Sequence, residues 1–247
     1  YSGSGSDTPS YQTSLGTHID YFVANGNTTS FYANSFIGSI DNISVIEVID
    51  ATNIPRIDYT TGEGVVLLEP QSTNLVTYSE DFSNASWGFY SFSGANMTEQ
   101  FGVLSPDGSN NATRLTYTNT SIGSGGSTLT SNITLVANAQ YTISFYAKHV
   151  SGTKQIRVDL RNSSSAGVSG ASFTLTNEWK RYTKTVTNDS ETNRGVQFRI
   201  LESEFQGDRA FDIYGAQLEA LPYATSYIPT SGAIATRLAD SVTGAGD

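Results

Sequence analysis

The stretch Gln140–His149, QYTISFYAKH, alternates apolar and polar residues from Tyr141 to Lys148. Successive side chains of an extended chain point to opposite sides, so this alternation predicts a strand with one buried and one exposed face. The side that we expect to be buried carries Tyr141, Ile143, Phe145 and Ala147. The side that we expect to be exposed carries Thr142, Ser144, Tyr146 and Lys148.

The same alternation returns in two later segments, KQIRVDLR at 154–161 and GVQFRIL at 195–201. Clusters of Asn, Ser and Gly separate the segments and are typical of turns. Residues of high β-propensity predict further strands at 75–79, 114–118, 128–135, 172–175, 179–187 and 210–219. Short strands at regular spacing predict an all-β fold, an antiparallel β-sandwich of the jelly-roll type, and no segment predicts an amphipathic helix.

The composition suits turn-rich β-structure, because only 15% of the 247 residues are charged and Ser, Thr, Asn and Gly are abundant. The chain has no cysteine, which excludes disulfides and thiolate metal sites. No apolar run is long enough to predict a membrane span. The chain starts at Tyr1 and its single methionine is Met97, so we expect a segment of a longer or processed protein.

The formal net charge is −10, which argues against general nucleic-acid binding because that function needs a basic face. The charge is uneven, since residues 141–209 hold ten basic and seven acidic side chains, a local balance of +3. Two interpretations stay open at this point. The basic residues form a solvated strand face, or they attract an anionic polymer.

Two segments suggest that the chain holds parts of two related domains. SIDNISVIEVID at 39–50 and FDIYGAQLEA at 211–220 are both alternating strands with acidic residues, and a polar connector with proline follows each. We therefore expect the closing strands of a first β-sandwich at 1–50 and a linker at 51–74. A complete β-sandwich domain is expected at 75–229, and a linker to a further domain at 230–247.

The segments PRIDYTTGEGVVLLEPQSTNLVTYSEDFSNASW (55–87) and YGAQLEALPYATSYIPTSGAIATRLAD (214–240) carry a family resemblance. They resemble jelly-roll carbohydrate-binding modules of tail-fibre and virion proteins of tailed bacteriophages. Similar modules are attached to marine polysaccharide-degrading enzymes. The resemblance implies a homo-oligomer, with a trimer as the expected state, and a location in the virion or, alternatively, secretion.

A sugar-binding face needs flat aromatic rings and planar polar side chains. The residues predicted to form such a platform are Tyr146, Lys148, Arg157, Asp159, Gln197 and Arg199. The alternative is that Tyr146 only covers a second face of its sheet. The resemblance implies that Trp87 and Trp179 pack against the core, whereas an exposed Trp87 would offer a stacking surface.

The resemblance also implies a structural calcium where the first and last strands of the domain meet. Calcium prefers several oxygen ligands, including carboxylates. The acids expected there are Glu80, Asp81 and Asp212. The alternative for Asp212 is a place at a sheet rim.

Catalysis finds little support in the sequence, and we expect no enzyme. His18 and His149 are the only imidazoles, and neither belongs to a motif for a nucleophile or a metal. Glu80 and Asp81 are adjacent and would point to opposite faces of a strand. We therefore expect a non-catalytic segment of a phage virion or tail-fibre-like protein that binds, or is displayed near, bacterial surface glycans. An accessory module of a marine polysaccharide-degrading enzyme and a spacer without a ligand are the alternatives.

Overall fold

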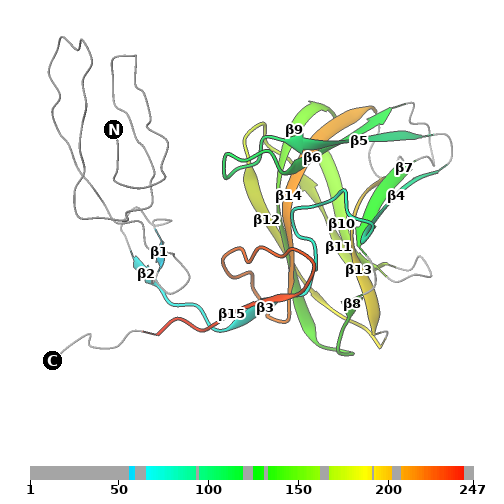
Figure 1. The fold of residues 1–247 in the computed structure, drawn as a ribbon. Coiled ribbons are helices and arrows are strands. Elements are labelled where there is room, and N and C mark those ends of the chain that lie inside the picture. Colours follow the sequence, from blue (N-terminus) through cyan, green and yellow to red (C-terminus); the bar gives the residue numbers. More distant parts are fainter. Residues whose placement is uncertain are drawn as a thin grey trace, which may run out of the picture. The chain divides into compact units, whose positions relative to one another are not determined.

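The computed structural model describes residues 56–58, 65–92, 95–118, 125–130, 133–161, 167–190, 192–201 and 207–241 (Figure 1). The chain divides into two units, Tyr1–Ile49 and Asp50–Asp247, and every described residue belongs to the second. The closing strands predicted at 1–50 therefore lie outside the described residues.

Two antiparallel sheets form the body of the second unit (Figure 1). The five-stranded sheet has the order β12 (Lys180–Thr187), β9 (Gln140–Gly152), β14 (Arg209–Glu219), β6 (Ala112–Thr118) and β5 (Asn96–Val103). The six-stranded sheet has the order β11 (Gly167–Thr174), β10 (Gln155–Arg161), β13 (Asn193–Leu201), β7 (Gly125–Thr130) and β4 (Trp87–Phe92), and β8 (Ile133–Thr134) pairs with β13. Two small ribbons pair β1 (Arg56–Asp58) with β2 (Val65–Leu67) and β3 (Ser72–Asn74) with β15 (Ala235–Arg237).

The core lies between the two sheets and is built by the alternation that the sequence shows. Ile143 of β9, Val158 of β10 and Phe198 of β13 are all 0% exposed. The ring of Phe145 packs edge-on against Phe198 at a centroid distance of 5.0 Å, which joins the two sheets. The all-β prediction, an antiparallel sandwich, is confirmed. Among the described residues there is no helix that could span a lipid bilayer.

The strand β14 is buried along its whole length because both of its faces are covered. Its inner face meets the core, and the segment 221–230 crosses the outer face of its sheet. The hydroxyl of Thr142 donates to the carbonyl of Leu221 at 2.7 Å, and Arg181 Nη1 donates to the carbonyl of Thr225 at 2.7 Å. The chain after β14 therefore folds back over the five-stranded sheet.

The linkers predicted at 51–74 and 230–247 are in part ordered pieces of the domain. Residues Ser72–Asn74 and Ala235–Arg237 pair as antiparallel strands. Beside this ribbon Arg237 Nη1 lies 2.5 Å from Glu69 Oε2, and the amide of Glu69 donates to Asp240. The prediction was wrong here because these strands are too short to show alternation and are held by partners far along the chain.

Candidate functional site

The outer face of the six-stranded sheet carries a row of polar side chains that crosses four strands. Strand pairing places Arg157 of β10 opposite Arg199 of β13, Arg199 opposite Ser127 of β7, and Ser127 opposite Tyr90 of β4. Directly paired residues of antiparallel strands point to the same face of a sheet. Their chain neighbours Val158, Phe198 and Thr128 are buried, so this row points away from the core.

A second row runs beside the first and is connected to it by hydrogen bonds. Asp159 accepts from Arg157 Nε at 2.8 Å through Oδ1 and from Arg199 Nε at 2.5 Å through Oδ2. Gln197 donates to the hydroxyl of Ser127 at 2.9 Å and accepts from Arg161 Nη1 at 2.9 Å. We call this surface the arginine face, defined by Tyr90, Ser127, Arg157, Asp159, Arg161, Gln197 and Arg199.

Glycine at position 170 makes room for the carboxylate at the centre of the arginine face. Gly170 of β11 is paired with Asp159, and a Cβ atom on Gly170 would lie 1.8 Å from Asp159 Oδ1. Such a distance is far shorter than any real contact, so a larger residue would displace the carboxylate. Asp159 is 2% exposed, and a buried carboxylate of this kind needs its two guanidinium partners.

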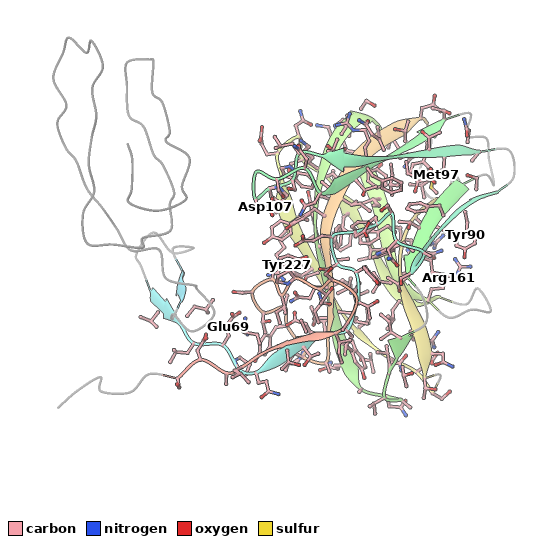
Figure 2. All side chains as sticks on the ribbon, in the orientation of Figure 1. Glu69, Tyr90, Met97, Asp107, Arg161 and Tyr227 are labelled. Atoms are coloured by element: carbon pink, nitrogen blue, oxygen red, sulfur yellow. The ribbon has the colours of Figure 1, made fainter. Side chains whose placement is uncertain are left out.

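Tyr90 supplies the exposed aromatic surface of the arginine face. Its side chain is 55% exposed, and it leans back along its strand over Gly88. A Cβ atom on Gly88 would lie 2.5 Å from the Tyr90 hydroxyl, so the glycine leaves the space that the ring occupies. Figure 2 shows Tyr90 and Arg161 on the side of the sandwich that carries β4, away from Asp107 and Tyr227. An exposed ring beside planar polar groups can stack on a sugar and bind its hydroxyls.

The structure divides the six predicted platform residues between the two sheets. Arg157, Asp159, Gln197 and Arg199 lie together on the arginine face. Tyr146 and Lys148 belong to β9 of the five-stranded sheet and point away from the core on the opposite side of the sandwich. The prediction of one shared platform was wrong, because alternation tells which side of a strand is exposed and not which sheet the strand joins.

Tyr146 is covered by other groups rather than presented to a ligand. Its ring lies 6.1 Å from that of Tyr227 and 6.0 Å from that of Tyr214, and the guanidinium of Arg181 lies 5.7 Å from its centre. Lys148 Nζ lies 3.6 Å from Asp212 Oδ2 and 5.1 Å from the ring centre of Trp179. The alternative that Tyr146 covers the second face of its sheet fits these contacts.

The three acids predicted to hold calcium do not gather around one point. Asp212 is 0% exposed and accepts two hydrogen bonds from Arg114, at 2.7 and 3.1 Å. Glu80 accepts from the hydroxyls of Tyr214 and Tyr227, and Asp81 accepts from Ser83. Within the described part of the chain, no three acidic or histidine side chains are grouped as a metal site requires. The shared site was wrongly predicted because Asp212 is already neutralised by two cations.

The cluster around Tyr214 contacts the segment 221–230 through Tyr227, whose hydroxyl donates to Glu80 at 3.1 Å. The Tyr214 hydroxyl lies 2.8 Å from Glu80 Oε1 and 2.9 Å from Asp107 Oδ2, so its single proton is shared between the two carboxylates. Burial, and then these two carboxylates, raise the pKa of Tyr214, whereas hydrogen bonds from Ser105 and Ser109 lower the pKa of Asp107. Both shifts keep the tyrosine protonated and Asp107 ionised at neutral pH, so the group is a stable hydrogen-bonded cluster.

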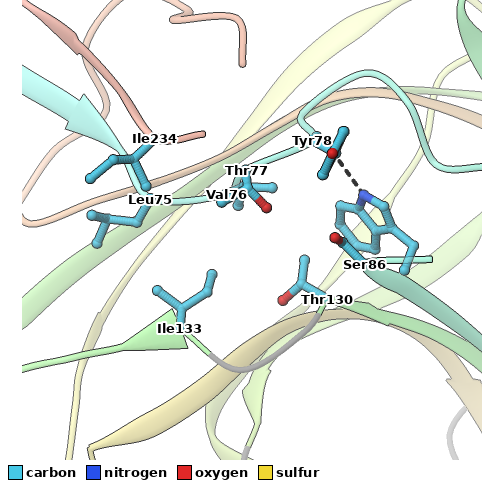
Figure 3. Close-up of a pocket in the computed structure, with 9 residues that line it drawn as sticks. Leu75, Val76, Thr77, Tyr78, Ser86, Thr130, Ile133 and Ile234 are labelled. Atoms are coloured by element: carbon cyan, nitrogen blue, oxygen red, sulfur yellow. Dashed lines mark hydrogen bonds between the residues drawn. The ribbon is translucent and has the colours of Figure 1, made fainter. Parts of the chain in front are cut away.

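The two tryptophans differ in their surroundings. Trp87 is 3% exposed, stacks on Phe82 at a centroid distance of 4.4 Å and donates from its indole nitrogen to the carbonyl of Tyr78 at 2.8 Å (Figure 3). The core role expected for Trp87 is confirmed. Beside it lies a mostly apolar cavity of about 190 Å³ that Leu75, Val76 and Ile234 help to line. Trp179 is half-buried beside Lys148 and does not belong to the core cluster.

Tyr90, Arg161 and Ser127 are the members of the arginine face that we did not predict. Arg161 lies on the predicted polar side of its strand, so the alternation that selected Arg157 and Asp159 also points to it. Tyr90 and Ser127 belong to strands rich in Gly and Ser, in which apolar alternation is weak. The one available signal is the pair Gly88 and Tyr90, since a glycine two positions before an aromatic residue leaves space on the same face.

The arginine face and the two sheets define a class, a β-sandwich with a broad polar face and an exposed aromatic ring at its edge. A model of the family described as "Carbohydrate binding domain" matches residues 74–203, which is just over half of the chain. The chain belongs to this family. Among curated proteins, none matches.

Solved structures are similar to the chain at low sequence identity. A CBM4 structure is 19% identical with a TM-score of 0.43, over 60% of this chain and 99% of that one. The Family 11 module from Clostridium thermocellum, solved with a β-1,3-1,4-mixed-linked tetrasaccharide, is 16% identical with a TM-score of 0.44, over 66% and 98%. The enzymatically active domain of tailspike protein 4 from bacteriophage CBA120 is 14% identical with a TM-score of 0.42, over 59% of this chain and only 21% of that domain.

Proposed function

We propose that the chain binds a polysaccharide through the arginine face and performs no catalysis on it. The observation that carries the proposal is the 55% exposed ring of Tyr90, which lies over Gly88 in line with the polar row Ser127, Arg199 and Arg157. A ring of this kind can cover one face of a sugar while Arg157 and Arg199, the partly exposed members of the row, bind its hydroxyls. Membership of the carbohydrate binding domain family, through residues 74–203, supports the same function.

Carboxylate geometry supports the non-catalytic part of the proposal. Hydrolysis of a glycosidic bond needs two carboxyl groups that flank the bond, one of them able to donate a proton. The carboxylate of the arginine face, Asp159, is 2% exposed and both of its oxygens accept from arginines. This group holds the site together and is not presented to a substrate.

The setting that we propose is an adhesive segment of a phage virion or tail-fibre-like protein, which would act on bacterial surface glycans. The resemblance of the segments 55–87 and 214–240 to such modules supports it. Several copies on one particle would multiply weak contacts, so a trimer fits this use. The family match is equally consistent with an accessory module of a polysaccharide-degrading enzyme, which is the second candidate.

The proposal is tested by the binding of the full 247-residue chain to a panel of immobilised polysaccharides. Tyr90→Ala removes the exposed ring, and burying one aromatic side chain is worth about 1.5–3 kcal/mol, so we expect a loss of roughly ten- to hundredfold in Kd. Tyr223→Ala is the matched control, because Tyr223 is 49% exposed in the segment that covers the other sheet. Equal losses for both variants, or no binding by the unaltered chain, would contradict the proposal.

A further inference from the structure

Arg161 is a half-buried cation whose described hydrogen bond goes to a neutral group. It is the last residue of β10, and its Nη1 donates to the amide oxygen of Gln197 at 2.9 Å. The nitrogen of that amide donates to the hydroxyl of Ser127, so Gln197 is held in one orientation by partners on both sides. A guanidinium has five N–H donors and stays charged at every physiological pH, so one bond to an amide leaves most of its binding capacity for a ligand.

The carboxylate that is nearest in the network is already used by the two neighbouring arginines. Asp159 binds Arg157 through Oδ1 and Arg199 through Oδ2. Burial and the positive charge of Arg199 lower the pKa of Arg161, and the negative charge of Asp159 offsets these two effects only in part. The negative charge of an anion at this position would offset the repulsion from Arg199.

We propose that the arginine face selects acidic polysaccharides, and that Arg161 binds a carboxylate or sulfate group of the sugar chain. The inference rests on the proposed function and adds the chemical class of the ligand to it. A planar guanidinium can bind either anion through two parallel hydrogen bonds, and such charge-assisted bonds are about twice as strong as neutral ones.

The distance across the sheet fits a polymer rather than a single sugar. Arg161 lies on β10 and Tyr90 on β4, and β13 and β7 lie between them. Neighbouring strands are about 4.8 Å apart, so the two side chains are separated by roughly 14 Å or more across the sheet. A sugar chain that crosses the strands would stack on Tyr90 at one end and place an acidic group at Arg161 at the other.

The test uses polysaccharides that differ only in charge. Polygalacturonate is compared with its methyl ester, and a sulfated galactan with the same galactan after desulfation, all with the full chain. We expect at least tenfold tighter binding to the charged member of one pair, and the pair in which this occurs identifies carboxylate or sulfate as the group bound. Arg161→Gln should remove most of that preference, since one charge-assisted hydrogen bond is worth about tenfold or more in affinity.

Two further variants separate a specific contact from general charge. Lys180→Gln removes the same charge from an exposed position on β12 of the other sheet and should leave the preference unchanged. Arg161→Lys keeps the charge but loses the two-pronged geometry, so it should retain only part of the preference. Thermal unfolding of each variant verifies that the fold is intact.

The two proposals fail in different ways. Equal binding of charged and neutral members, with a loss on Tyr90→Ala, overturns the acidic ligand and leaves polysaccharide binding in place. A preference that Lys180→Gln lowers as much as Arg161→Gln also overturns it, because the attraction would then be unspecific. No binding to any polymer of a wider neutral and acidic panel contradicts the proposed function itself.

Discussion

At the scale of single residues, the arginine face depends on the absence of one side chain. Replacing Gly170 by alanine would put a Cβ atom 1.8 Å from Asp159 Oδ1. The carboxylate would have to move, and Arg157 and Arg199 would lose their hydrogen bonds to it. We expect Gly170→Ala to lower the free energy of unfolding by about 1–3 kcal/mol, the usual cost when a buried charged group loses its partners, as measured by denaturant unfolding.

Ser172→Ala is the control for this prediction, because Ser172 is exposed on the same strand and is paired with Arg157. Its effect should stay within about 0.5 kcal/mol, as for most surface substitutions. Equal stability of the two variants would show that Asp159 tolerates displacement and is not the centre of the network.

Single residues also show where the sequence is informative. Alternation correctly placed Ile143, Val158 and Phe198 in the core, because a period of two follows directly from strand geometry. The same rule placed Tyr146 and Arg157 on exposed sides but could not tell that they lie on opposite sheets. Pairing between strands is decided by contacts between residues far apart in the chain, which no local pattern records.

At the scale of elements, the ribbon of β3 and β15 fastens the segment after β14 to the domain. Glu69 is 8% exposed, and its carboxylate accepts from Arg237 Nη1 at 2.5 Å and from the amide of Ser226 at 2.6 Å. Arg237→Ala would leave this carboxylate buried without its cation. We expect a loss of about 2 kcal/mol in the free energy of unfolding, because the buried carboxylate loses the guanidinium that binds it.

The control for Arg237→Ala lies at the neighbouring position of the same strand. The hydroxyl of Thr236 bonds to that of Thr73 at 2.8 Å on the exposed side of the ribbon, so Thr236→Ala should cost less than about 1 kcal/mol. Calorimetric unfolding of both variants makes the comparison. If Arg237→Ala were as harmless as Thr236→Ala, the segment 230–240 would behave as the linker that the sequence suggested.

Elements with strong alternation were predicted well, including the edge strand β12, whereas the edge strands β4 and β5 were not. The strands β9, β10 and β13 follow the expected pattern because each has one face in the core. The strand β5 was missed because it lies at the edge of its sheet, where Met97 is its one buried residue. A strand with a single buried residue shows no apolar alternation, so its sequence alone does not identify it.

At the scale of the whole molecule, two electrostatic effects of opposite sign act on an acidic polysaccharide. The chain carries a formal net charge of −10, which repels a polyanion from a distance, whereas Arg157, Arg161 and Arg199 attract it at the arginine face. Salt screens the long-range repulsion more effectively than it screens a close, half-buried contact. The balance between the two effects therefore changes with ionic strength.

We expect the affinity for the preferred acidic polysaccharide to pass through a maximum as salt is raised. At about 0.01 M salt the Debye length is about 30 Å, and the whole negative chain opposes binding; near 0.1 M it is about 10 Å, and the repulsion is largely screened. At about 1 M the contact with Arg161 weakens as well. Binding titrations at these three salt concentrations would show the maximum. Arg161→Gln should make the decrease in affinity above about 0.1 M salt smaller. Basic proteins bind polyanions with an affinity that decreases steadily as salt is raised. The same steady decrease here would mean that the net charge of −10 does not repel a polyanion from the arginine face.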